Sequence, residues 1–271
     1  MLAPVMVVIL GLFCGGIILG VSDGLTLAHF RDLAKDSEFR LSLVFTTLVA
    51  CIATLLSSAG GLAVALAVRP LVKSNATLYT LLQTPLAIPH LAMAFFLIHM
   101  ISPSGLLARI AHASGLIAKP AEFLELVNDR YGLGILITYL AKEIPFIAVM
   151  VLALLLRIGG EHDEVARTLG ATRWQRLRHV TLPMIWPALL AASIFVFAYV
   201  FSAFEIPFLL GRPYPAMLSV VTQRRYMATD LAERPGAIAI AVVMSVLTSV
   251  SVWAYLKLTR RVGGTGKPIF F

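Results

Sequence analysis

The chain has 271 residues, of which 59% are hydrophobic and 13% are charged, and its mean hydropathy is +0.90. That composition excludes an ordinary soluble domain and predicts a protein of the lipid bilayer. The formal net charge of +8 indicates membrane topology and contact with lipid headgroups, because nucleic-acid binding would require a basic soluble domain.

Six long apolar runs predict an all-α, polytopic membrane protein with six transmembrane helices. A helix needs roughly 20 mostly apolar residues to cross ~30 Å of hydrocarbon. The runs are continuous rather than alternating, which excludes a β-barrel. The predicted spans are residues 3–21, 41–68, 78–101, 131–157, 184–205 and 236–257.

The first run is expected to be a retained helix and not a cleaved signal, because no Lys or Arg precedes it and its apolar part is long. Six spans place both termini on one side of the membrane, and the Lys and Arg counts of the two sets of loops do not decide which side. Cys14 and Cys51 form neither a disulfide framework nor a metal spacing. The sequence shows no repeat or linker, so residues 1–271 are predicted to form one transmembrane domain.

Three short segments between the spans are predicted to be amphipathic helices. The first lies between Thr26 and Asp36, with Leu27, Phe30, Leu33 and Ala34 at helical spacing. The second follows Pro120, whose fixed φ suits a first helical turn, and the third covers residues 217–230. We expect them to lie on the membrane surface, and contact with a soluble partner stays open.

A polar segment, residues 161–183, separates two apolar runs and is called the connector below. Its acidic start precedes Val165 and Leu169, which share one helical face, and Gly170 can adopt the positive φ that ends a short helix. Thr172 and Gln175 then fit a capping box that begins a second short helix. Leu182-Pro183 is expected to turn the chain back into the membrane.

The connector resembles the cytoplasmic loop of permease subunits of binding-protein-dependent ABC importers, the MetI-like family. In that family the loop reads Glu-Ala-Ala, three residues, Gly, nine residues and Ile-x-Leu-Pro. The matching positions are Glu164-Val165-Ala166, Gly170 and Val180-Thr181-Leu182-Pro183, with the spacing intact. Val165 and Val180 depart from the pattern but remain apolar. More loosely, the resemblance covers residues 42–257.

The resemblance implies that the connector docks on a cytosolic ATPase and transmits its movement to the membrane helices. The implied ATPase-coupling residues are Glu164, Val165, Ala166, Leu169, Gly170, Leu182 and Pro183. It also implies a bacterial inner-membrane protein with both termini cytoplasmic, a second permease subunit and an extracytoplasmic solute-binding protein as partners. The segment from Glu205 to Gly211 resembles the branch that handles polyamines, thiamine, ferric ion or phosphonates.

ATP and Mg²⁺ are expected to bind a separate ATPase subunit, so no cofactor is predicted for this chain. A phosphate-binding loop needs Gly, four residues, Gly-Lys and Ser or Thr. The most similar segment has Arg261 at the first position and Pro268 at the last. A metal enzyme is disfavoured because His90 and His99 lie on opposite helical faces, and no nucleophile turn occurs. We predict no metal site and no catalytic residue.

Polar residues inside the predicted spans are candidates for the translocation pathway, because they are costly there. His90 and Glu143 each lie about 12 residues from the start of their spans, roughly 18 Å into the bilayer at ~1.5 Å per residue. We expect His90, Lys142 and Glu143 to border the route, with Glu205 near its outer mouth. The alternative is that Lys142 and Glu143 make interhelical pairs and that His90 is a packing residue.

Two other functions remain open at this point. A secondary carrier or channel would also show six spans and charges at mid-depth, but it gains nothing from a stiff connector and usually shows inverted repeats. A membrane scaffold that transports nothing could use the connector to hold a soluble protein. Co-purification with an ATPase argues against the carrier, and solute-stimulated ATP hydrolysis argues against the scaffold.

Overall fold

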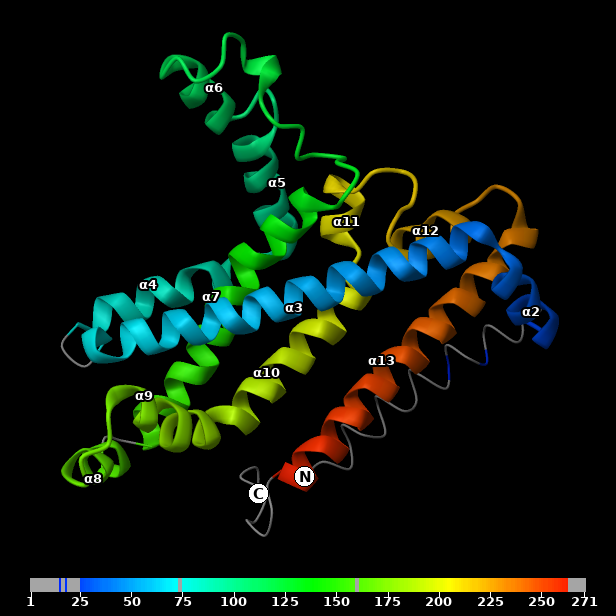
Figure 1. Cartoon of the computed structure of the whole chain (residues 1–271). Helices are drawn as coiled ribbons and strands as arrows, with labels where there is room; N and C mark the ends of the chain where they lie inside the picture. Colours follow the sequence, from blue (N-terminus) through cyan, green and yellow to red (C-terminus); the bar gives the residue numbers. More distant parts are fainter. Residues whose placement is uncertain (1–14, 16–17, 19–24, 73–74, 159–160, 263–271) are drawn as a thin grey trace.

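The computed structural model describes residues 15, 18, 25–72, 75–158 and 161–262, and this part of the chain is helical with no strand. Long helices cross one another to form the body (Figure 1): α3 (Ser37–Val72), α7 (Leu133–Ile158), α10 (Leu182–Ser202) and α13 (Arg234–Val262). Shorter elements connect them: α2 (Leu27–Lys35), α4 (Ala76–Ala87), α5 (His90–Ile101), α6 (Leu106–Ala113), η1 (Pro120–Glu122), α8 (Glu161–Thr168), α9 (Arg173–Arg176), η2 (Leu177–Thr181), α11 (Glu205–Leu210), α12 (Leu218–Tyr226) and η3 (Leu231–Glu233). The predicted all-α class is confirmed.

Five helical segments of the described residues are long and apolar enough to cross a membrane. They are Ser37–Val72, His90–Ala113, Leu133–Ile158, Arg173–Ser202 and Leu231–Ala254. These agree with the second, fourth, fifth and sixth predicted spans, whereas the third is displaced along the chain. The first predicted span, residues 3–21, lies outside the described residues apart from positions 15 and 18.

The prediction of an unbroken third span over residues 78–101 was wrong. The helix stops after Ala87 and restarts at His90, because Ile88 and Pro89 are extended, with ψ values of 126° and 144°. Proline disfavours the helical conformation in the residue before it and has no N–H to continue the ladder. The apolar run is therefore split into α4 and α5, and the candidate span continues from α5 into α6.

The core lies around α7, which packs against α3, α10 and α4. Ile135, Ile147 and Val151 of α7 are fully buried. On α3 the small residues Ser57, Gly61 and Ala65 are buried at a spacing of four. A Cβ atom at Gly61 would lie 2.7 Å from the Cβ atom of Ile147, so the predicted packing seam lets the two backbones approach closely.

Of the three predicted amphipathic pieces, α2 and α12 form, whereas the helix expected after Pro120 does not. Only a single turn, η1, begins at Pro120, and Phe123 after it is extended with ψ 150°. A little further on, the backbone N–H of Asn128 donates to the carbonyl oxygen of Leu210, 2.8 Å away. The segment after η1 is therefore hydrogen-bonded to α11 at Asn128 and does not form a longer helix of its own.

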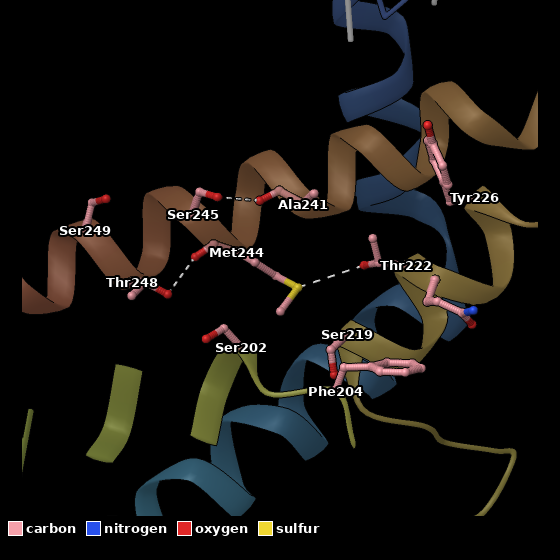
Figure 2. Close-up of a pocket in the computed structure, with 11 residues that line it drawn as sticks. Ser202, Phe204, Ser219, Thr222, Tyr226, Ala241, Met244, Ser245, Thr248 and Ser249 are labelled. Carbon is pink, nitrogen blue, oxygen red and sulfur yellow. Dashed lines mark hydrogen bonds between the residues drawn. The ribbon is translucent and has the colours of Figure 1, made fainter. Parts of the chain in front are cut away.

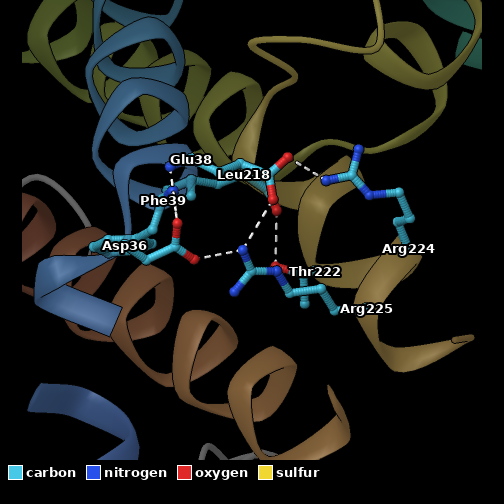
Figure 3. Close-up of polar contacts among 7 residues, drawn as sticks. All are labelled: Asp36, Glu38, Phe39, Leu218, Thr222, Arg224 and Arg225. Atoms are coloured by element: carbon cyan, nitrogen blue, oxygen red, sulfur yellow. Dashed lines mark hydrogen bonds and ion pairs between the residues drawn. The ribbon is translucent and has the colours of Figure 1, made fainter. Parts of the chain in front are cut away.

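Helix α12 is fastened to the start of α3 by polar contacts (Figure 3). Arg225 donates to Asp36 at 2.5 Å and to Glu38 at 2.9 Å, and Arg224 also donates to Glu38. Burial alone would raise the pKa of Asp36, but the hydrogen bond and charge of Arg225 hold it below its ordinary value. Thr46 adds a buried bond, because its hydroxyl oxygen accepts from the N–H of Leu218 at 2.9 Å.

Candidate functional site

The connector folds as predicted in its first half. Helix α8 ends in a Schellman motif, in which Ala171 N–H donates to Ala166 O and Gly170 N–H donates to Arg167 O, both at 3.0 Å. Gly170 has φ +80°, the left-handed conformation that glycine adopts without strain. Thr172 and Gln175 form the predicted capping box at the start of α9. Hydrogen bonds therefore define both sides of the turn.

The second half of the connector differs from the prediction that Leu182-Pro183 turns the chain. The helix is continuous from Arg173 to Ser202. Its five residues Leu177–Thr181 form a π-helical turn, and Leu182 N–H donates to Leu177 O five residues back. Proline has no N–H and its ring crowds the preceding turn, so this wider turn lets the helix pass Pro183 without breaking. The connector thus leads straight into a membrane span.

Apolar side chains of the connector are exposed in this chain. Val165 is 59% exposed and Leu169 is 82% exposed, and Trp174 at the start of α9 is 64% exposed. Glu164 is also exposed, whereas Ala166 is half-buried against the rest of the protein. In Figure 1, α8 and α9 lie at one end of the long helices, and α11 and α12 lie at the other. An exposed apolar face on a well-defined turn is typical of a surface that another protein covers.

The structure brings together three of the four predicted pathway residues. Lys142 of α7 donates its ammonium to the carbonyl oxygen of Ile88, at the break between α4 and α5. Glu143, the next residue, lies with its Oε1 atom 3.6 Å from Nε2 of His90, the first residue of α5. Both α7 residues are buried, each with 5% of its surface exposed. The two neighbours in sequence therefore have separate partners across helices, because they point to different sides of α7.

Two tyrosines, Tyr139 and Tyr199, join His90, Lys142 and Glu143 in what is called the buried cluster, and neither was predicted from the sequence. The ring of Tyr199 on α10 lies 4.5 Å from the ring of His90, centroid to centroid, and Tyr139 meets Tyr199 edge-on at 6.3 Å. Tyr139 precedes Glu143 by four residues, a spacing that places both on one face of α7. This spacing is the sequence signal that could have placed Tyr139 beside the cluster. Glu205, the fourth predicted pathway residue, begins α11 and is exposed.

A separate pocket of about 680 Å³ opens between the end of α10, α12 and α13 (Figure 2). Hydroxyl groups of Ser219, Thr222, Ser245 and Thr248 line it. Each donates to a backbone carbonyl oxygen, at distances from 2.7 to 2.9 Å. The lining hydroxyls are therefore largely satisfied within the protein. Among the residues that the structure describes, no three His, Cys, Asp or Glu side chains are grouped to hold a metal ion.

Residues 57–264, which include the connector and the buried cluster, match the family described as the binding-protein-dependent transport system inner membrane component. The chain belongs to this family. It is 27% identical over 259 residues to the inner membrane ABC transporter permease protein YnjC of Escherichia coli strain K12, covering 92% of this chain but 48% of YnjC. The chain thus spans about half the length of that relative.

A second relative is the sulfate transport system permease protein CysT of Salmonella typhimurium strain LT2, 25% identical over 237 residues, or 87% of this chain and 82% of CysT. A chain of a bacterial alginate ABC transporter, crystallised with an alginate pentasaccharide-bound periplasmic protein, superposes with a TM-score of 0.81. At 21% identity, and with 98% of this chain and 95% of that chain covered, this likeness shows the shared fold. This chain therefore shares its fold with a chain of an ABC transporter.

Proposed function

We propose that this chain is the transmembrane permease subunit of an ATP-binding-cassette importer, forming half of the translocation pathway for a small solute. The observation that carries the proposal is the connector, which presents exposed Val165 and Leu169 between two membrane spans of a chain that belongs to this transport family. A partner would bury these side chains with a gain of ~25 cal/mol per Å² of apolar surface. The partner is a cytosolic ATPase, which binds the ATP and Mg²⁺ and carries out the hydrolysis.

The proposed mechanism passes force from the connector along a single helix. Closure of two ATPase subunits pushes the connectors of two permease subunits, and the bundles rock between inward and outward access. The continuous helix from Arg173 to Ser202 carries that push to Tyr199, which contacts His90 in the buried cluster. A slack linker at Leu182-Pro183 would absorb the movement, so the unbroken helix supports direct coupling.

We place the solute route beside the buried cluster of His90, Lys142 and Glu143, with Glu205 toward the outer mouth. Two interrupted helices meet there, since α4 and α5 part at Ile88 and α10 and α11 part at Ala203. Interrupted helices with buried charges are typical of solute sites in transporters. Sulfate, which appears in the name of CysT, and polyamines, thiamine, ferric ion and phosphonates are the solutes to test first.

The assembly proposed here is an inner-membrane complex in which residues 1–271 act as one permease domain with both termini in the cytoplasm. Its other members are two ATPase subunits, a second permease subunit, an extracytoplasmic solute-binding protein and the surrounding lipid. No contact with nucleic acid is proposed.

The decisive experiment is co-expression of the chain with its proposed ATPase and solute-binding protein partners. We expect the ATPase to co-purify with a tagged chain, and ATP hydrolysis in proteoliposomes to rise when the solute-loaded binding protein is added. The double variant Val165→Asp, Leu169→Asp should abolish both, while Arg173→Asp, at an exposed position outside the apolar face of α8, serves as the matched control. Solute transport by the chain without any ATPase would overturn the proposal in favour of a carrier.

A further inference from the structure

One buried hydroxyl in the cluster has no hydrogen-bond partner. Tyr139 is fully buried, and its Oη atom meets no donor or acceptor among the described residues. A buried polar group without a partner costs folding free energy, because it gives up its bonds to water and receives none in return. Phenylalanine at this position would fill nearly the same volume without that cost.

Tyr139 is joined to the cluster by contacts between rings. Tyr139 and Glu143 are four residues apart on α7 and share a helical face. The ring of Tyr199 on α10 meets Tyr139 edge-on, with 6.3 Å between the ring centroids. Tyr199 in turn packs on His90, whose ring nitrogen lies 3.6 Å from Glu143. The hydroxyl therefore belongs to the group of side chains that surrounds the two helix breaks.

The ammonium of Lys142 is directed elsewhere, to the carbonyl oxygen of Ile88. It therefore leaves the hydroxyl of Tyr139 unpaired, although both residues lie on the same turn of α7. Among the described residues, no other group forms a hydrogen bond with that hydroxyl.

We propose that Tyr139 is a solute-contacting, specificity-determining residue, whose buried hydroxyl hydrogen-bonds to a polar oxygen or nitrogen of the solute as it passes the cluster. The inference rests on the proposed function, because it places the solute route at the same cluster. It adds a selection rule. A solute that offers a hydrogen-bonding group to Tyr139 recovers the bond that folding left unmade, whereas an apolar solute of the same size leaves the hydroxyl unpaired.

Exposure of position 139 during transport tests the inference even while the solute is unidentified. Tyr139→Cys is made in a cysteine-free background, and the complex with its ATPase and binding protein is treated with 2-(trimethylammonium)ethyl methanethiosulfonate. His90→Cys is the positive control, since the His90 side chain is already 33% exposed. Ser42→Cys is the negative control, because Ser42 is fully buried on α3 one turn from Thr46, which contacts α12.

We expect ATP turnover to raise the rate of modification at position 139 by about tenfold or more, because an open state that is a minor species at rest becomes well populated. Position 42 should stay unreactive with and without ATP. Modification at position 90 without modification at position 139 would overturn the inference and leave the proposed function standing. If neither position reacts during turnover, both the inference and the placement of the solute route at the cluster are refuted.

Tyr139→Phe supplies a second test that does not depend on cysteine substitution. Removing an unpaired buried hydroxyl should leave the melting temperature of the complex no lower than that of the wild type, while stimulation of ATP hydrolysis by the solute-loaded binding protein falls about threefold to tenfold, the effect of one lost hydrogen bond. Ser42→Ala removes another unpaired buried hydroxyl and should change neither quantity. A lower melting temperature with a parallel loss of stimulation would show a structural role and overturn the inference.

Discussion

At the scale of single residues, conformation and burial decide which side chains can act. Gly170 matters for its backbone alone, since a Cβ atom there would meet nothing within 4 Å, while its φ is +80°. Lys142 and Glu143 matter for their charges, which are kept in the protein interior by partners on the α4 and α5 break. A substitution at Gly170 therefore tests the backbone conformation of the turn, whereas a substitution at Glu143 tests the charge of its side chain.

Replacing Gly170 by Val should weaken coupling while leaving the protein inserted in the membrane. A β-branched residue resists positive φ, at a cost of about 1–2 kcal/mol, so the turn between α8 and α9 opens. The measurement is ATP hydrolysis stimulated by the binding protein. Gly170→Asn is the matched control, because asparagine tolerates this conformation and should retain most of the stimulation. Wild-type stimulation in the Val variant would count against the turn.

Replacing Glu143 by Gln should lower solute uptake about tenfold or more at normal protein level, a rise in barrier of about 1.4 kcal/mol. The change keeps the shape of the side chain but removes the charge beside His90. Glu125→Gln, at an exposed site, should leave uptake unchanged. Undiminished uptake by the Glu143 variant would remove this residue from the route.

At the scale of elements, close packing and polar fastening hold the long helices in place. The seam of Ser57, Gly61 and Ala65 brings α3 against α7, and Arg225 joins α12 to the start of α3. The seam is predictable from small residues spaced by four. The ion pair between Arg225 and Asp36 is not predictable from the sequence, because the two residues are far apart along the chain and neither carries a local signal.

Replacing Gly61 by Ala should destabilise the protein by about 1–3 kcal/mol through overpacking. The new methyl group would lie 2.7 Å from side-chain atoms of Ile147, so α3 and α7 must separate. Gly236→Ala on α13 is the matched control, since a Cβ atom there meets nothing within 4 Å. Thermal unfolding in detergent measures both, and equal melting temperatures for the two variants would contradict the packing argument.

The stabilisation of the folded protein by the ion pair between Arg225 and Asp36 should depend on pH. Because the pKa of Asp36 is lowered in the folded protein, its stabilisation is present above the ordinary value of 3.8 and is lost as pH falls through the lower, folded value. Arg225→Gln should therefore lower the melting temperature by about 2–4 °C near neutral pH, for roughly 1 kcal/mol.

The difference between wild type and Arg225→Gln should shrink once pH drops below 3.8, the ordinary pKa of the aspartate. Arg40→Gln, at an exposed position on the same end of α3, should show no such difference at any pH. A gap between wild type and the Arg225 variant that persists in strong acid would mean that the ion pair is not its source.

At the scale of the whole molecule, the arrangement links the two ends of the helices. The connector lies at one end, α11 and α12 lie at the other, and the continuous helix ending in α10 runs between them (Figure 1). The buried cluster sits where α5, α7, α10 and α11 come together. A displacement of the connector can therefore reach the cluster through one rigid element.

The proposed orientation predicts which loops face the cell exterior. In a cysteine-free background, Lys119→Cys should react with a membrane-impermeant maleimide in intact cells. Arg173→Cys, on the connector, should react only after the cells are opened. Both positions are exposed, so accessibility to the reagent and not burial decides the result. Labelling of position 173 in intact cells would place the connector outside and refute the coupling role.

The sequence by itself determined the helical class, four of the membrane spans, and the capped turn at Gly170, because hydropathy, helix caps and positive-φ glycine act over short stretches of chain. It mispredicted the third span and the turn at Leu182-Pro183, where proline is either a break or is absorbed by a π turn depending on its surroundings. Only the tertiary structure decided that Lys142 and Glu143 take separate partners at the α4 and α5 break and that Tyr139 and Tyr199 join them. Those contacts depend on how helices distant in sequence cross, which no local pattern encodes.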